Sequence, residues 1–493
     1  MKKSFIFLPL CALSLLASCS FLDKRPLTDI TPENFFTSSD DAEASLTAVY
    51  DALQGTGAYG QDLNVMGEMP SDNCTSTNGD VNAMDKIIWT PTTGQVYNVF
   101  RQAYVGINRA NIVLKYVPTI TMDTARRSQI QGEARFARAL CYFNLVRAYG
   151  GVPLRLEPTE SGAPADVNLA RATADQIYAQ VVADLQRAAI QMRASSPNRA
   201  GKNAANALLA RVQLTQRNWA AAQAAANKVI AAGVSLNSSF KSLYPAENKG
   251  AESLFEVQYA GNADGGNILP DLLLPSPLAT YSFPKFNIPT TELLTYADTV
   301  NDRRWAYNGQ VTSGSRTVGR DHASYIDGKP GRNGNSNDVG PFVYKWTSIG
   351  NNFNSTDNTY VLRYAEVLLA YAEAANEQTG PSADVLAKLN LVRQRAGLTA
   401  LTLASTQALS KQAMRNEIDR QRRLELAFEG ERWFDLLRYA RHTAADASAT
   451  HAVTALDLIA QQRMGVRDVN YLLFPLPQAE LNTNPLLQQN PGY

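Results

Sequence analysis

The stretch EARFARALCYFNLVRAYGG, residues 133–151, decides the fold class. It belongs to a run over residues 128–149 in which alanine, phenylalanine, leucine and tyrosine dominate, while Glu133, Arg135 and Arg138 fall near one side. A helix with this pattern is buried over most of its circumference. Gly150 and Gly151 then predict its end, because glycine commonly follows the last turn of a helix.

Helical spacing of apolar residues recurs in most long segments of the chain, and these segments come in pairs. Residues 203–232 contain two alanine-rich helices around a turn near Arg217 and Asn218, and this pair resembles a tetratricopeptide hairpin. The strict repeat of about 34 residues does not recur. The sequence therefore predicts a mainly α-helical scaffold, with helical segments over residues 38–53, 95–116, 128–149, 173–194, 203–232, 360–378, 383–396 and 407–442.

Residues 233–359 have a different character, because glycine, asparagine, serine, proline and aromatic residues dominate there. We expect long loops with a few short strands, such as one over Ser253–Tyr259. Loops of this length in a compact protein are usually functional or disordered.

The first residues resemble a bacterial lipoprotein signal. Lys2 and Lys3 precede an apolar run that is too short to span a membrane stably, and Leu16-Ala17-Ser18-Cys19 resembles a lipobox. Residues 1–18 are thus the predicted signal peptide, and Cys19 is the predicted site of lipid attachment. Two or three acyl chains would anchor the protein firmly. The alternative is an ordinary secreted protein with an incidental cysteine.

Composition excludes several functional classes. The 493 residues carry a formal net charge of +1, which gives no support to nucleic-acid binding. The three histidines, His322, His442 and His451, lie in no zinc-binding motif. Besides the predicted lipid site Cys19, only Cys74 and Cys141 remain after the signal, and a disulfide between them is possible in an exported protein. The sequence predicts no metal site and no cofactor, and because no EF-hand pattern is present it does not decide whether the loops bind calcium.

Five stretches together resemble the SusD/RagB family of outer-membrane lipoproteins. The stretches are EARFARALCYFNLVRAYGGVPL (133–154), LRYAEVLLAYAEAANE (362–377), LNLVRQRAGL (389–398), RRLELAFEGERWFDLLRYAR (422–441) and LFPLPQAELNTNPLLQQNPGY (473–493). The resemblance covers the mature chain from Cys19 to Tyr493. Gln421 departs from the family pattern, which often has glutamate before the paired arginines.

The resemblance implies a scaffold of tetratricopeptide-like helix pairs, with long irregular insertions that form the ligand-facing side. It divides the mature chain into residues 19–232 and 233–493. It also implies a partner, a SusC-like TonB-dependent transporter, over which the protein acts as a lid that captures a glycan. The expected location is the outer membrane, facing the cell exterior.

Charged residues recur at helical spacing in two of these stretches, one with Arg363 and Glu366, the other with Arg422, Glu425 and Glu429. Paired carboxylates are typical of glycosidases. Here the acids alternate with arginines at spacings of three and four, which predicts structural ion pairs instead.

Loop aromatic residues beside amides are the predicted ligand-binding residues, because sugar rings stack on aromatic faces while their hydroxyls need polar partners. Trp89 and Asn73 form the first candidate pair, since sites of the family often draw on this early loop. The other candidates are Trp346 with Asn351 and Asn352, Tyr281 with Phe283, and Trp305 with Tyr307. For each aromatic residue the alternative is a ring that only fixes its loop to the body.

Three functions are consistent with these features. The first is a glycan-binding lid without catalysis, and the second is a lid that captures peptides or another nutrient. The third is an enzyme, but no nucleophile elbow, metal motif or phosphate loop supports it. An exposed backbone edge for an extended peptide would favour the second function.

Overall fold

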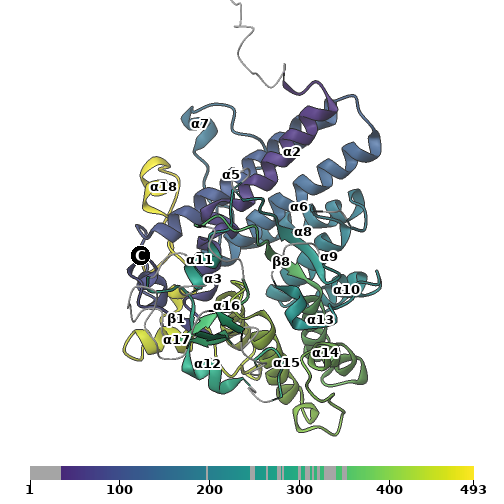
Figure 1. Ribbon diagram of the computed structural model, residues 1–493. Coiled ribbons are helices and arrows are strands. Elements are labelled where there is room, and N and C mark those ends of the chain that lie inside the picture. Colours follow the sequence, from purple (N-terminus) through teal and green to yellow (C-terminus); the bar gives the residue numbers. More distant parts are fainter. Residues whose placement is uncertain are drawn as a thin grey trace, which may run out of the picture.

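Packed pairs of helices form most of the molecule (Figure 1). The computed structural model describes residues 35–195, 198–244, 250–261, 265–274, 279, 283–297, 301–305, 311–313, 316–318, 323–326, 340–346 and 352–493. In its first half, α2 (Ser39–Gln54) packs on α5 (Gly94–Tyr116), and α5 packs on α6 (Thr124–Tyr149). α8 (Ala174–Gln191) lies between α6 and α9 (Lys202–Thr215).

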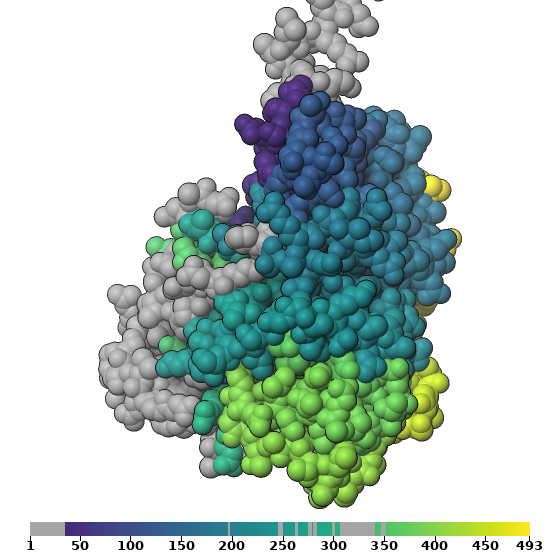
Figure 2. Space-filling view, turned by 90° about the vertical axis from the view of Figure 1, so that its right-hand side faces the viewer, coloured from purple at the N-terminus to yellow at the C-terminus, as the bar shows by residue number. Residues whose placement is uncertain are grey.

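The series continues into the second half of the chain. α10 (Trp219–Ile230) packs on α9 and on α13 (Tyr364–Thr379), and α13 packs on α14 (Ala383–Arg395) and α15 (Lys411–Leu426). Figure 2 shows the side of the molecule that these helices form, as a continuous surface from blue at the top to green at the bottom. The predicted mainly α-helical scaffold of helix pairs is confirmed. The division at residue 232 remains a prediction, and α10 and α13 pack together across it.

Small side chains explain the close packing of α10 on α13. Ala222, Ala370 and Ala374 form a buried cluster with Leu214, and Trp219 covers it. The predicted turn between α9 and α10 is confirmed, because Arg217 adopts a left-handed conformation there with φ of 62°.

α6 is the buried helix that its sequence predicts. Asp123 caps its first turn by accepting a hydrogen bond from the Arg126 backbone N–H at 2.7 Å. It ends at Gly150, whose φ of 75° favours glycine. Almost every residue from Gln129 to Tyr149 is buried, and Arg138 is neutralised by Asp184 at 2.8 Å.

The described strands are short and form two-stranded sheets. β1 (Cys74–Thr75) pairs antiparallel with β3 (Ile288–Pro289), and β2 (Ser253–Val257) pairs antiparallel with β8 (Thr359–Arg363). The predicted helix over 360–378 is therefore wrong at its start, because Tyr360–Arg363 pair with β2 before α13 begins. Two further hairpins are β4–β5 (Val311–Ser313, Arg316–Val318) and β6–β7 (Ala323–Ile326, Gly340–Val343).

The remaining helices are short except for α16 (Arg432–Ala445). They are α3 (Asp62–Glu68), α4 (Asn82–Asp85), α7 (Pro164–Val167), α11 (Leu269–Leu273), α12 (Thr291–Tyr296), α17 (Ala455–Gln462) and α18 (Gln478–Thr483). Within the described ranges, no helix has the length and apolar character needed to cross a bilayer. Cys74 and Cys141 are both free and buried, so they form no disulfide with each other.

A sharp corner joins α15 to α16. Phe428 and Gly430 have φ values of 68° and 78°. The Glu68 carboxylate accepts hydrogen bonds from both of their backbone N–H groups, at 2.8 and 3.1 Å. Gly67 permits this approach, because a Cβ atom there would lie 1.8 Å from the Gly430 carbonyl oxygen. α3 is thus bound tightly to the corner.

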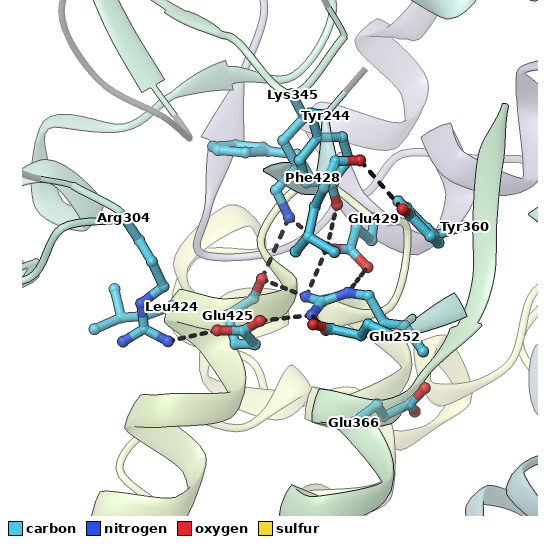
Figure 3. Close-up of polar contacts among 12 residues, drawn as sticks. Tyr244, Glu252, Arg304, Lys345, Tyr360, Glu366, Leu424, Glu425, Phe428 and Glu429 are labelled. Atoms are coloured by element: carbon cyan, nitrogen blue, oxygen red, sulfur yellow. Dashed lines mark hydrogen bonds and ion pairs between the residues drawn. The ribbon is translucent and has the colours of Figure 1, made fainter. Parts of the chain in front are cut away.

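A buried ion-pair network centres on Arg363, at the junction of β8 and α13. Its guanidinium binds Glu425 at 2.5 Å, Glu429 at 2.8 Å and Glu252 at 2.9 Å. Figure 3 shows these three carboxylates converging from different segments. Arg304 pairs with the other oxygen of Glu425 at 2.9 Å, and Lys345 pairs with Glu429 at 2.5 Å.

The predicted structural ion pairs are confirmed. Glu366 binds Arg422 at 2.9 Å. Gln421, which stands where the family often has glutamate, accepts a hydrogen bond from Arg304 at 2.8 Å, so its side-chain oxygen still has a partner. Although burial favours its neutral form, Arg363 and Lys345 lower the pKa of Glu429 to about 2. Carboxylates held in the ionised form by arginines are poor general acids.

We predict that Glu429→Gln destabilises the protein by about 3 kcal/mol at pH 7, because it leaves Arg363 and Lys345 buried with one fewer counter-charge. The contribution of Glu429 is complete above its unfolded-state pKa of 4.5 and is lost as the pH falls toward about 2. Urea unfolding of the wild type and the variant from pH 7 to pH 3 measures the difference, which should shrink with falling pH.

Glu160→Gln is the matched control. Its side chain is 56% exposed and pairs with Lys115 on the surface, so its removal should change stability much less than the removal of Glu429 does. A stability loss in Glu429→Gln that is equally small would contradict the role given to the network.

Candidate functional site

A polar cleft of about 390 Å³ opens beside β1, on the side of the molecule that carries α12 and α17 (Figure 1). We call it the β1 cleft. Its lining comes from four segments: Pro70, Ser71, Asp72, Cys74 and Thr75; Asp85, Lys86 and Ile87; Thr290 and Glu292; and Val453, Leu458, Gln461 and Gln462. Lys86, Glu292 and the two glutamines are exposed there. The cleft thus offers mixed hydrogen-bonding groups with both signs of charge.

The β1–β3 ladder forms one wall of the cleft. Cys74 lies opposite Pro289 and Thr75 opposite Ile288. Thr290 follows directly and caps α12, because its side-chain oxygen accepts a hydrogen bond from the Leu293 N–H at 3.1 Å. The Thr290 N–H in turn donates to the Asn73 carbonyl at 2.9 Å, which links the start of α12 to the loop before β1.

Charged groups of the cleft floor are paired. Asp72 receives the Arg432 guanidinium at 2.8 Å and that of Arg423 at 3.3 Å. Although burial opposes the shift, these arginines hold the pKa of Asp72 below its ordinary value. Glu292, at the rim, also binds Arg423 at 2.7 Å. The floor is therefore electrostatically balanced.

Asn73 is fully buried beneath the cleft, so the prediction of an exposed, ligand-facing amide is wrong. Its Nδ2 donates to Glu68 at 2.8 Å, and its Oδ1 accepts from Arg423 Nε at 2.9 Å. Because both ends of the amide are occupied, Asn73 fixes the loop between α3 and β1. Burial raises the pKa of its partner Glu68 to about 7.

Trp89 is 1% exposed and presents no face to solvent. Its Nε1 donates to the Tyr493 hydroxyl at 2.7 Å, and its ring packs on Phe474 with centroids 4.4 Å apart. The expectation of an exposed ring is therefore wrong, and Trp89 fixes the C-terminal segment to the body.

Trp305 and Trp346 are buried as well, at 0% and 2% exposure. Trp305 donates to the Leu424 carbonyl at 3.3 Å, and Trp346 packs beside Tyr244 at 6.4 Å. Both expectations of exposed rings are wrong for the same reason: burying a large ring stabilises a loop more than exposing it does. Three other candidates, Tyr281, Tyr307 and Asn351, lie outside the described residues.

Asn352, also a candidate, is exposed and lies next to an aromatic pair that includes Phe283. The rings of Phe283 and Phe353 are half-buried and nearly parallel, with centroids 6.4 Å apart and an angle of 22°. The sequence analysis did not select Phe353, although its position between amides in NNFN is the signal that could have identified it. We call this surface the Phe283–Phe353 pair.

The chain around this pair is strained and firmly supported. Asn352 and Phe353 both have positive φ, 50° and 61°, a conformation that non-glycine residues rarely adopt. The Phe353 N–H donates to Asp271 at 2.9 Å, and the Lys285 ammonium lies 3.8 Å from the Phe283 ring centroid. Strain of this kind persists where the surroundings hold the backbone in place, often at ligand sites.

Metal binding receives no support from the described part of the chain, where no three histidine, cysteine, aspartate or glutamate side chains come together. His442 and His451 do meet, with 3.2 Å between Nδ1 and Nε2, but no third ligand joins them there.

Two family models match the chain. Residues 20–214 match the model described as "Starch-binding associating with outer membrane", and residues 293–493 match the model described as "SusD family". A SusD-like protein of Formosa agariphila is 27% identical, and the alignment covers 100% of this chain and 99% of that protein. The starch-binding protein SusD of Bacteroides thetaiotaomicron is 23% identical, with 86% and 84% covered.

Solved structures share the fold. A laminarin-binding SusD-like protein superposes with a TM-score of 0.72 at 26% identity, over 93% of this chain and 100% of that one. A SusD homolog of Bacteroides thetaiotaomicron gives a TM-score of 0.77 over 94% and 98%, and its 23% identity shows similarity of fold alone. The two family models, the full-length relatives and the common fold show that this chain belongs to the SusD/RagB family.

Proposed function

We propose that this protein is a glycan-binding lipoprotein of the outer membrane that captures oligosaccharide or polysaccharide without catalysis. The observation that carries the proposal is the Phe283–Phe353 pair beside the exposed amide of Asn352. Aromatic faces bind apolar C–H surfaces, and a few placed polar groups then fix orientation. A sugar ring has both kinds of surface.

The β1 cleft would supply further polar contacts to the same ligand. Thr75 lines the cleft, and its neighbour Ser76 donates a hydrogen bond to the Lys285 carbonyl at 2.6 Å. Asn78 likewise donates to the Pro284 carbonyl at 2.8 Å. Because Pro284 and Lys285 directly follow Phe283, the cleft wall and the aromatic pair lie within about 15 Å of each other. That separation suits a ligand of several sugar units.

The relatives support a glycan rather than a peptide. The name of one relative refers to starch, and that of one solved structure refers to laminarin, both of which are glycans. The exposed edge that a bound peptide would extend is also short, because β1 and β3 have two residues each. Peptides remain the competing ligand class in the binding experiment below.

We further propose that Cys19 carries the lipid and that a SusC-like TonB-dependent transporter is the partner, with this protein as its lid on the cell exterior. The description of the first matched family model, which names association with the outer membrane, supports this location. A tether would keep the lid beside its transporter, because it converts their encounter into an intramolecular one with high effective concentration.

We predict that residues 20–493 bind one class of glycan and that Phe283→Ala and Phe353→Ala each weaken this binding about tenfold, as expected for the loss of one stacking face. Glycan arrays and peptide pools identify the ligand, and isothermal titration calorimetry measures the affinity of each variant.

Tyr116→Ala is the matched control, because Tyr116 also belongs to an aromatic pair, with Phe36 at 4.9 Å, and Phe36 packs on a different hydrophobic cluster from the one that Phe283 and Phe353 contact. Its removal should leave glycan affinity unchanged. Glycan binding that survives in both phenylalanine variants would contradict the assigned surface, and binding of peptides alone would contradict the ligand class.

We predict that Cys19→Ala releases the protein from the membrane fraction, because no other lipid site is expected in the chain. Fractionation of cells after a high-salt wash, followed by immunoblotting, measures the distribution. A variant that stays in the membrane pellet would show that something other than a lipid on Cys19 retains it.

A further inference from the structure

A small cavity of about 10 Å³ lies where α6, α9, α15 and α16 meet, and it shares no lining residue with either proposed ligand-binding surface. It is large enough for one particle of about the size of a water molecule. Five arginines line it, Arg147, Arg211, Arg422, Arg438 and Arg441. So dense a set of guanidinium groups around a small space requires counter-charge.

The described carboxylates that pair with these five arginines are one fewer than the arginines. Glu431 binds Arg147 at 2.5 Å and Arg211 at 2.9 Å. Asp435 binds Arg422 at 2.7 Å and Arg438 at 2.8 Å.

Behind this lining, Glu366 pairs with Arg211 and Arg422, and Glu373 pairs with Arg438. Four carboxylates thus serve five arginines. Arg441 donates to the Leu472 carbonyl at 3.2 Å but pairs with no carboxylate in the described ranges.

Two donors on arginines that line the cavity also lack acceptors. Arg422 is 1% exposed and Arg147 is 3% exposed. Arg422 Nη1 and Arg147 Nε have no hydrogen-bond partner among the described residues. Leaving such buried donors unsatisfied costs free energy, and the cost is larger for charged groups.

We propose that this cavity binds one small monovalent anion, chloride under ordinary conditions. A single negative charge matches the excess of one arginine, and a monatomic ion matches the volume better than phosphate or sulfate does. The ion accepts hydrogen bonds from Arg422 and Arg147. It joins helices from the two halves of the chain, so this site is structural and independent of glycan binding.

A water molecule is the competing occupant. Water satisfies the two donors, but it brings no negative charge to the buried guanidinium groups of Arg147 and Arg422, whose hydrogen bonds are stronger to an ionised acceptor than to a neutral one. Arg441 and Thr215 are half-buried at the cavity lining, which gives an ion a route of exchange with solvent.

Crystals of residues 20–493 grown in sodium bromide distinguish the two occupants, because bromide scatters anomalously and water does not. We expect an anomalous peak in contact with Arg422 Nη1 and Arg147 Nε. Density in the cavity without an anomalous signal would overturn the proposal.

Thermal unfolding at constant ionic strength, with chloride replaced by gluconate, gives a second test. Above the dissociation constant, the Tm should rise by about 1 °C for each tenfold increase in chloride concentration. Arg441→Gln removes the excess charge and should abolish this dependence. Arg441 is half-buried, and circular dichroism checks that the variant folds.

Arg467→Gln is the control, because Arg467 is 60% exposed and pairs with Asp457 away from the cavity. It should keep the chloride dependence of the wild type. A wild-type Tm that does not change with chloride, or an equal dependence in Arg441→Gln, would overturn the proposal.

Discussion

The pairing of Arg363 with three buried carboxylates is the interaction on which the rest of the structure depends. Glu252 comes from the loop before β2, while Glu425 and Glu429 come from the end of α15 and its corner. Burying these charges is tolerated only when each is paired with good geometry. The network therefore fixes where the irregular segments leave the helical scaffold, and the removal of one partner is costly because it leaves the others buried without compensation.

The same constraint extends to the ligand-facing side. Glu68 binds the corner after α15 and also holds Asn73, which in turn fixes the loop that leads into β1. From there, Ser76 and Asn78 hold the segment that follows Phe283. Hydrogen bonds, together with the short backbone segments between them, thus connect the corner beside the buried acids to the proposed glycan surface. Such support lets irregular loops present side chains in fixed positions.

Periodicity and local chemistry were enough to predict most of the scaffold and the pairing of its acids with arginines. The candidate site was predicted poorly, because the partners that decide exposure are distant in sequence. Trp89 is buried by Tyr493, and Asn73 is occupied by Arg423, contacts that no local pattern reveals. Phe353 was missed although its position between amides in NNFN was a usable signal; what the sequence does not predict is the positive φ on which its half-exposed position depends.

A crystal structure of residues 20–493 in complex with the glycan that binds best would test the central claim most directly. The account predicts a sugar ring stacked on the Phe283–Phe353 pair, with Asn352 in hydrogen-bond contact and the next units directed along the β1 cleft. Sugar density on the helical face shown in Figure 2, with the aromatic pair empty, would contradict it.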